Sequence, residues 1–138
     1  KLPNETDKIN LSLKNTKILL MLTKIEPDKG VNDAVLGISA EKVSFPNFLP
    51  EVLIKSYLNE ASVMAETITI PLASAKFSGK DFAWCETASS ATGFKRRVFV
   101  TNAKGIALEI FLIYRNEADL NLMLDSLKEL KLTGAASL

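Results

Sequence analysis

Apolar and polar residues alternate along most of this chain, a pattern typical of half-buried β-strands. The alternation predicts seven strands, at Ile9–Leu13, Lys17–Ile25, Ala34–Val43, Thr67–Phe77, Phe82–Thr87, Phe94–Asn102 and Ile106–Tyr114. The strands Lys17–Ile25 and Ile106–Tyr114 are apolar on both faces, so we expect them to lie centrally in a sheet that is covered on each side. Pro71 indicates that Thr67–Phe77 lies at an edge or carries a bulge, because proline cannot donate to a strand ladder.

Two segments show the 3.6-residue spacing of amphipathic helices. The first is expected to open within 46–50, with Asn47 as its N-cap and Pro50 in the first turn. Its apolar stripe comprises Leu49, Leu53, Tyr57, Leu58, Ala61, Met64 and Ala65. The second is expected to start at Asn116, which forms a capping-box-like pair with Asp119. Its stripe comprises Leu120, Met123, Leu124, Leu127 and Leu130.

The order of elements predicts the fold class. Tight turns at Ser78–Asp81 and Ala103–Gly105 imply hairpins and a mostly antiparallel sheet. The order βββαββββα, with one helix available for each face, predicts an α+β fold, a helix–sheet–helix (α/β/α) sandwich. A length of 138 residues fits a single domain over 1–138, with loosely ordered ends at 1–8 and 133–138.

The composition narrows the chemistry. The chain has no histidine and one cysteine, which excludes Ser-His-Asp and Cys-His nucleophiles and imidazole zinc sites. It carries no phosphate loop, dinucleotide fingerprint or calcium loop, so we predict no catalytic residues, no cofactor and no metal. The net charge of +1 argues against a nucleic-acid partner. The longest apolar run, Ile18–Leu22, is too short for a transmembrane segment.

Four side chains are candidates for a partner-binding surface: Lys95, Arg97, Trp84 and Lys80. The run Lys95–Arg97 is the one basic cluster. It could be a solvated strand or an edge protected by charge, or it could contact an anion or an acidic partner beside the 88–93 loop. If Arg96 lies on a covered face, it needs a buried carboxylate such as Glu86 or Glu109. An exposed Trp84 would be an anchor for a partner.

Other candidate chemistry has a structural alternative. Alternation places Ala83 and Cys85 on one small-residue face suited to helix packing, and without histidine Cys85 is expected to be a buried, inert thiol. Asp81, Glu86 and Glu109 could supply a catalytic carboxylate pair, although their spacing does not demand one. The aromatic residues Trp84, Phe82, Tyr57 and Phe94 could be core or could line a groove.

The C-terminal half carries a family resemblance. Its residues are Phe77–Ala83, the hairpin at Gly105, Tyr114 and the closing helix at Leu124–Leu130. Over residues 34–132 the chain resembles the PsbP-like superfamily, which includes the Ran-binding Mog proteins and related bacterial domains of unknown function. The resemblance implies an α/β/α sandwich and an accessory or protein-binding role, with no catalytic residues carried over.

We therefore expect a non-enzymatic accessory or protein-binding module, with another protein as its partner. The alternatives are a small-molecule or lipid carrier with a cavity between sheet and helix, and a carboxylate-based hydrolase. The sequence begins at Lys1 and not at methionine, so either a leader was removed or the sequence is trimmed; of the two locations we favour an exported protein (periplasmic, secreted or lipoprotein) slightly over a cytoplasmic one. We expect a monomer or weak dimer.

Overall fold

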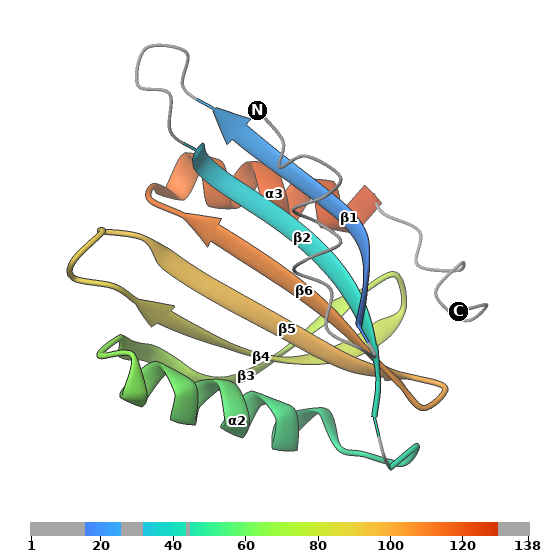
Figure 1. Cartoon of the computed structure of the whole chain (residues 1–138). Helices are drawn as coiled ribbons and strands as arrows, with labels where there is room; N and C mark the ends of the chain where they lie inside the picture. Colours follow the sequence, from blue (N-terminus) through green and yellow to red (C-terminus); the bar gives the residue numbers. More distant parts are fainter. Residues whose placement is uncertain (1–15, 26–31, 44, 130–138) are drawn as a thin grey trace.

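A six-stranded antiparallel sheet with two helices forms the structure (Figure 1). The computed structural model describes residues 16–25, 32–43 and 45–129. The elements are β1 (Thr16–Ile25), β2 (Asn32–Lys42), α2 (Pro50–Val63), β3 (Thr67–Phe77), β4 (Lys80–Ala88), β5 (Lys95–Ala103), β6 (Ile106–Tyr114) and α3 (Glu117–Glu129). This order confirms the α+β class and the expected succession from the second strand onward. The strand expected at Ile9–Leu13 lies outside the described residues.

The spatial order of the strands is β1-β2-β6-β5-β4-β3, and every neighbouring pair is antiparallel. The central position expected for Ile106–Tyr114 is confirmed, because β6 lies between β2 and β5. The strand expected centrally at Lys17–Ile25 is instead the terminal strand of the described sheet, since β6 takes the second partner position beside β2. The prediction from Pro71 is confirmed: β3 is the opposite terminal strand, with register shifts between Ile68 and Ala73.

Two tight hairpins connect the strands on which the site is built. Lys104 and Gly105 have φ angles of 55° and 87°, and Ser78 and Gly79 have 52° and 74°. Positive φ at both central residues is the geometry of a type I′ turn, whose twist matches that of paired strands. A Cβ at Gly105 would lie 3.2 Å from the Cβ of Pro46, a tight contact, so glycine is favoured there by space as well as by conformation.

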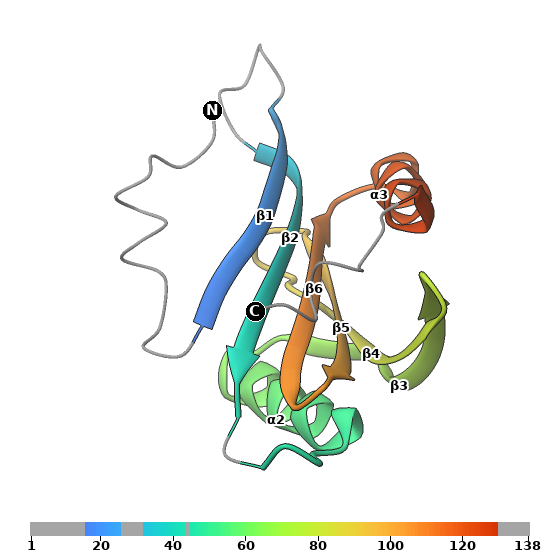
Figure 2. The same ribbon diagram turned by 90° about the vertical axis from the view of Figure 1, so that its right-hand side faces the viewer.

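The two helices cover opposite faces of the sheet, which confirms the helix–sheet–helix sandwich (Figure 2). Alternate residues of each strand separate into two apolar clusters. The cluster beneath α2 contains Ile54, Ala83, Cys85, Val98 and Val100. The cluster beneath α3 contains, among others, Phe82, Phe99, Leu108, Ile110, Leu112, Leu120, Met123 and Leu127. We call these two sides the α2 face and the α3 face.

The predicted capping residue is found at the start of α3 but not at the start of α2. At α3, the backbone N–H of Asp119 donates to Oδ1 of Asn116 over 2.9 Å, as the capping pair requires. At α2, the N-cap is Leu49, without a side-chain cap bond, and the expectation for Asn47 was wrong. Pro50 is the first helical residue, and its fixed φ favours the first turn without a cap.

No helix in the described ranges is long and apolar enough to cross a membrane.

Candidate functional site

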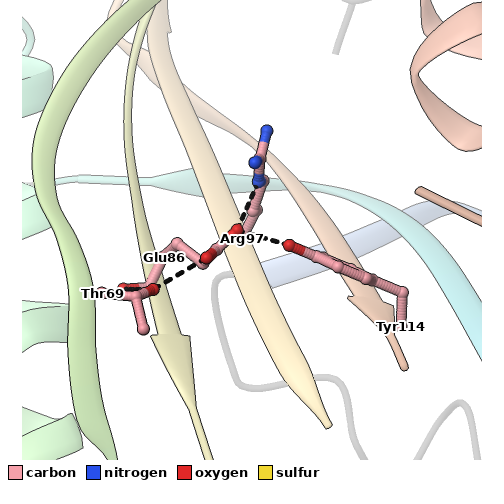
Figure 3. A network of polar contacts seen from close by, with 4 residues as sticks. All are labelled: Thr69, Glu86, Arg97 and Tyr114. Atoms are coloured by element: carbon pink, nitrogen blue, oxygen red, sulfur yellow. Dashed lines mark hydrogen bonds and ion pairs between the residues drawn. The ribbon is translucent and has the colours of Figure 1, made fainter. Parts of the chain in front are cut away.

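The buried carboxylate of Glu86 is the centre of a polar network on the α3 face (Figure 3). Thr69 Oγ1 donates to Glu86 Oε1 over 2.8 Å, and Arg97 Nε donates to Oε2 over 2.7 Å. The hydroxyl of Tyr114 donates to the same Oε2. Three strands, β3, β5 and β6, therefore each supply one donor to a carboxylate on β4.

Strand register explains why these side chains meet. Glu86 and Arg97 are direct cross-strand partners in the β4–β5 pair. Thr69 lies in the register shift between Ile68 and Ile70, where β3 has one residue more than its partner strand. Such a bulge redirects side chains, and here the Thr69 hydroxyl also donates to the Glu86 carbonyl oxygen over 3.1 Å.

The network keeps Glu86 ionised. Burial raises the pKa of this carboxyl, but the hydrogen bonds from Tyr114, Arg97 and Thr69 outweigh it and leave the pKa below its ordinary value. Burial and then the bond to Glu86 raise the pKa of Tyr114 well above its ordinary value. At neutral pH the network therefore contains a carboxylate, a guanidinium and a neutral phenol, and the charges of Glu86 and Arg97 cancel.

Arg97 is fixed from two sides. Its guanidinium carbon lies 4.5 Å from the centre of the Trp84 ring, and Trp84 stacks on Phe99 with ring centres 5.4 Å apart. Among the hydrogen bonds of the described residues, Arg97 uses Nε alone, and its terminal nitrogens point away from Glu86 (Figure 3). The side chain is 18% exposed and lines the cleft described below, so it is accessible to a ligand.

A cleft of about 530 Å³ lies between the sheet and α3, and Arg97 forms part of its wall. Its apolar lining comes from Ala75, Phe77, Trp84, Phe99 and Leu124, and its polar lining comes from Ser74, Arg97, Asn121, Asp125 and Lys128. Ser74 and Asn121 are exposed, so the cleft opens to the surface. Lys128 Nζ lies 3.8 Å from Asp125 Oδ1. The charges of this pair cancel, as those of Glu86 and Arg97 do.

The structure brings two of the four candidate residues together. Arg97 and Trp84 are stacked in the cleft. Lys95 lies at the start of β5, opposite Tyr114, on the side of the sheet that Arg97 shares. Lys80 begins β4 opposite Phe77 and does not line the cleft. One of the alternatives for the basic cluster, an edge protected by charge, is excluded, because β5 is paired on both sides, with β4 and β6.

Arg96 has a different partner from the two that the sequence suggested. Its Nη2 donates to Glu66 Oε2 over 3.1 Å, on the α2 face. Glu66 reaches this position because Ala65 adopts a φ of 58° and the Glu66 N–H donates to the Ala61 carbonyl, which ends α2 in a Schellman-like turn. Glu86 is unavailable to Arg96 because its side chain lies on the other face, where Arg97 holds it.

The second buried carboxylate, Glu109, lies on the α2 face. Tyr57 donates to its Oε2 over 2.6 Å, while its Oε1 has no hydrogen-bond partner among the described residues. Burial raises the pKa of Glu109 to about 7; the bond from Tyr57 opposes this increase, and Glu41 and Glu60 add to it. Sequence reasoning missed Tyr57 as its partner because this tyrosine belongs to the apolar stripe of α2.

The carboxylates considered for hydrolysis do not converge. Glu86 and Glu109 lie on opposite faces of the sheet, and Asp81 is exposed and paired with Lys76 over 3.6 Å. The interpretation that two of these three residues form a catalytic pair is therefore wrong.

The four candidate aromatic residues also lie apart from one another. Trp84 and Phe82 lie on the α3 face, Tyr57 packs on Phe111 on the α2 face, and Phe94 packs beneath Arg115.

The expected burial of the one cysteine is confirmed. Cys85 is 1% exposed and packs in the cluster of Ile54 and Ala83, beneath α2. Burial raises the pKa of its thiol, so it is a poor nucleophile at neutral pH.

Among the described residues, no group of three or more cysteine, aspartate or glutamate side chains could hold a metal ion.

Comparisons with known proteins give little beyond this geometry. No protein-family model matches the chain, and no curated protein matches it, so the PsbP-like resemblance has no independent support. Among solved structures, LpqN of Mycobacterium tuberculosis, described as involved in cell envelope biogenesis, aligns with a TM-score of 0.47 and 11% identity over 86% of this chain and 78% of LpqN. The extracellular domain of PknH from the same organism aligns with a TM-score of 0.35 and 6% identity over 93% of this chain and 91% of that domain. At these values neither similarity carries an argument about function.

Proposed function

We propose that this chain is a non-enzymatic accessory module that binds another protein through the cleft between its sheet and α3. The observation that carries the proposal is the position of Arg97, stacked on Trp84 at the wall of that cleft. Tryptophan and arginine are the side chains most enriched at binding hot spots, where rigid anchors contribute most of the affinity. Here both are held rigid before a partner arrives.

The role of Glu86 supports binding over catalysis. Its carboxylate is buried, accepts from three protein donors and orients Arg97, so it is not presented to a substrate. The mixed lining of the cleft, with an aromatic base and polar rim residues, is typical of a recognition surface.

A matched pair of variants tests this proposal. Asn121 lies on the cleft side of α3 and Asn59 lies in α2, and both are exposed. Asn121→Arg should obstruct the cleft, while Asn59→Arg adds the same side chain away from it. We expect partners captured by the wild-type chain from the source organism to be lost with Asn121→Arg and retained with Asn59→Arg. Equal capture by both variants would overturn the proposal.

One observation favours a second candidate, the small-molecule carrier. A volume of about 530 Å³ between sheet and helix falls within the range of small-molecule sites, roughly 300–1,000 Å³. Native mass spectrometry of the purified chain separates the two functions. A carrier should retain a stoichiometric small ligand, whereas a protein-binding module should give the mass of the chain alone.

We further propose that the module acts outside the cytoplasm of a bacterium, as a monomer or weak dimer. An exported location fits its single, buried thiol, which no oxidant would readily reach. A signal peptide or lipoprotein leader encoded upstream of Lys1 in the reading frame would support this location, and a reading frame that lacks one would oppose it.

A further inference from the structure

We propose that the cleft recognises a carboxylate flanked by an apolar side chain, presented by an extended segment of the partner protein. This inference rests on the proposed function and names the chemistry of its partner. Arg97 would bind the carboxylate, and Trp84, Phe99 and Leu124 would contact the apolar side chain.

The anion-binding group is the free end of the Arg97 guanidinium. Glu86 accepts from Nε over 2.7 Å, so the fork of Nη1 and Nη2 remains, which is the part of arginine that matches a carboxylate with two parallel hydrogen bonds. Glu86 and the Trp84 ring already hold this fork in one orientation. Binding therefore costs little further side-chain entropy, which is the advantage of a preorganised site.

The apolar contacts lie beside the same fork. Trp84 and Phe99 are stacked at 30°, Phe77 packs edge-on against Phe99 with ring centres 5.2 Å apart, and Leu124 of α3 lies across the cleft. An apolar side chain adjacent in sequence to the carboxylate would reach this aromatic surface while the carboxylate engages Arg97. A simple inorganic anion would leave the surface unused.

Local charge favours a single negative charge over a double one. The two cations that line the cleft, Arg97 and Lys128, are each paired with an acid, Glu86 and Asp125. A dianionic phosphate would bring a second negative charge close to both of these carboxylates, whereas a monoanionic carboxylate adds only one. The open rim at Ser74 and Asn121 favours a protein segment, whose own chain would close the cleft, over an enclosed small molecule.

The indole N–H of Trp84 makes the test direct, because the chain has one tryptophan and therefore one indole signal in a nitrogen–proton NMR spectrum. We would titrate the full chain with the peptide acetyl-Leu-Glu-Phe-amide and with its isosteric control acetyl-Leu-Gln-Phe-amide. 3-Phenylpropanoate and inorganic phosphate complete the series as a free organic acid and a dianion. Arg97→Lys, which keeps a cation beside Glu86 but removes the fork, would be titrated with the glutamate peptide.

We expect the glutamate peptide to shift the Trp84 signal with an affinity about tenfold or more above that of the glutamine peptide, the usual effect of a charge-assisted pair. Arg97→Lys should lose a similar factor. Equal affinity for the two peptides, no shift with either, or tighter binding of phosphate would overturn the carboxylate assignment. Tighter binding of 3-phenylpropanoate than of the glutamate peptide would contradict the proposal that the carboxylate belongs to a protein segment. If Asn121→Arg abolishes partner capture while the two peptides bind equally, the proposed function stands and this inference alone fails.

Discussion

Glu86 and Glu109 are both almost completely buried, with 5% and 4% exposure, yet they face opposite sides of one sheet and their pKa values shift in opposite directions. Glu86 receives three hydrogen bonds, including one from a guanidinium, and its pKa is lowered. Glu109 receives one hydrogen bond, from a phenol, so burial raises its pKa, and the nearby Glu41 adds to the increase. Burial raises the pKa of both residues, and only at Glu86 do the hydrogen-bond donors outweigh it.

Replacing Glu109 should stabilise the protein at alkaline pH. Its pKa is about 7 in the folded state against an ordinary 4.5. The stability that its proton contributes is full below the unfolded pKa and is lost as the pH rises through the folded pKa. A shift of this size corresponds to a loss of about 3 kcal/mol. Glu109→Gln keeps the acceptor for Tyr57 without the charge, so it should abolish this loss.

The measurement is the urea-induced unfolding of wild type and Glu109→Gln at about pH 4 and about pH 8, on either side of the two pKa values. We expect the two proteins to have similar free energies of unfolding at the acidic pH, and the variant to be more stable at the alkaline one. A difference of the same size at both pH values would show that Glu109 does not titrate in this interval.

Replacing Glu86 should have the opposite effect. Glu86→Gln leaves the half-buried guanidinium of Arg97 without its carboxylate, and losing such a charge-assisted hydrogen bond costs about 2 kcal/mol. Because the folded pKa of Glu86 is lowered, its contribution is present above the unfolded pKa and is lost as the pH falls through the folded pKa. The deficit of the variant should therefore shrink in acid. A neutral-pH loss below about 0.5 kcal/mol, the size of an ordinary surface substitution, would contradict this role.

The two hairpin glycines should differ in their tolerance of alanine. Gly79→Ala suffers only the strain of positive φ, about 1 kcal/mol, because nothing lies within 4 Å of the added Cβ. Gly105→Ala suffers the same strain and also meets Pro46 at 3.2 Å. Thermal unfolding should therefore show a larger decrease in Tm for Gly105→Ala. Equal decreases would mean that the segment at Pro46 moves aside at no cost.

The thiol of Cys85 should be unreactive until the protein unfolds. It is buried beneath α2 and its pKa is raised, so both access and thiolate formation are limited. We expect a thiol-specific reagent such as dithionitrobenzoate to react with the folded protein at the rate of unfolding, and with the urea-denatured protein at once. A rapid reaction of the folded protein would show that the cover provided by Ile54 and α2 opens readily.

Within the described residues, local patterns were sufficient to predict which segments form strands and helices. The alternation that assigned Ala83 and Cys85 to a helix-covered face is a property of one strand, and it is confirmed. The site was harder, because its members are distant in sequence and meet through register. Thr69 reaches Glu86 because β3 is irregular at that point, and the cleft lies beside α3 because this helix packs mainly on β6 and β2. No periodicity along a single segment contains that information.

The measurement that tests the role of the cleft most directly is acrylamide quenching of the Trp84 fluorescence, with the free chain and with the chain saturated by its captured partner. Trp84 is the one tryptophan of the chain and lines the cleft, so a tryptophan-free partner or segment leaves its signal isolated. We expect quenching to decrease strongly on binding, because the partner covers the indole. Unchanged quenching on a saturated complex would place the partner elsewhere and contradict the cleft as the binding site.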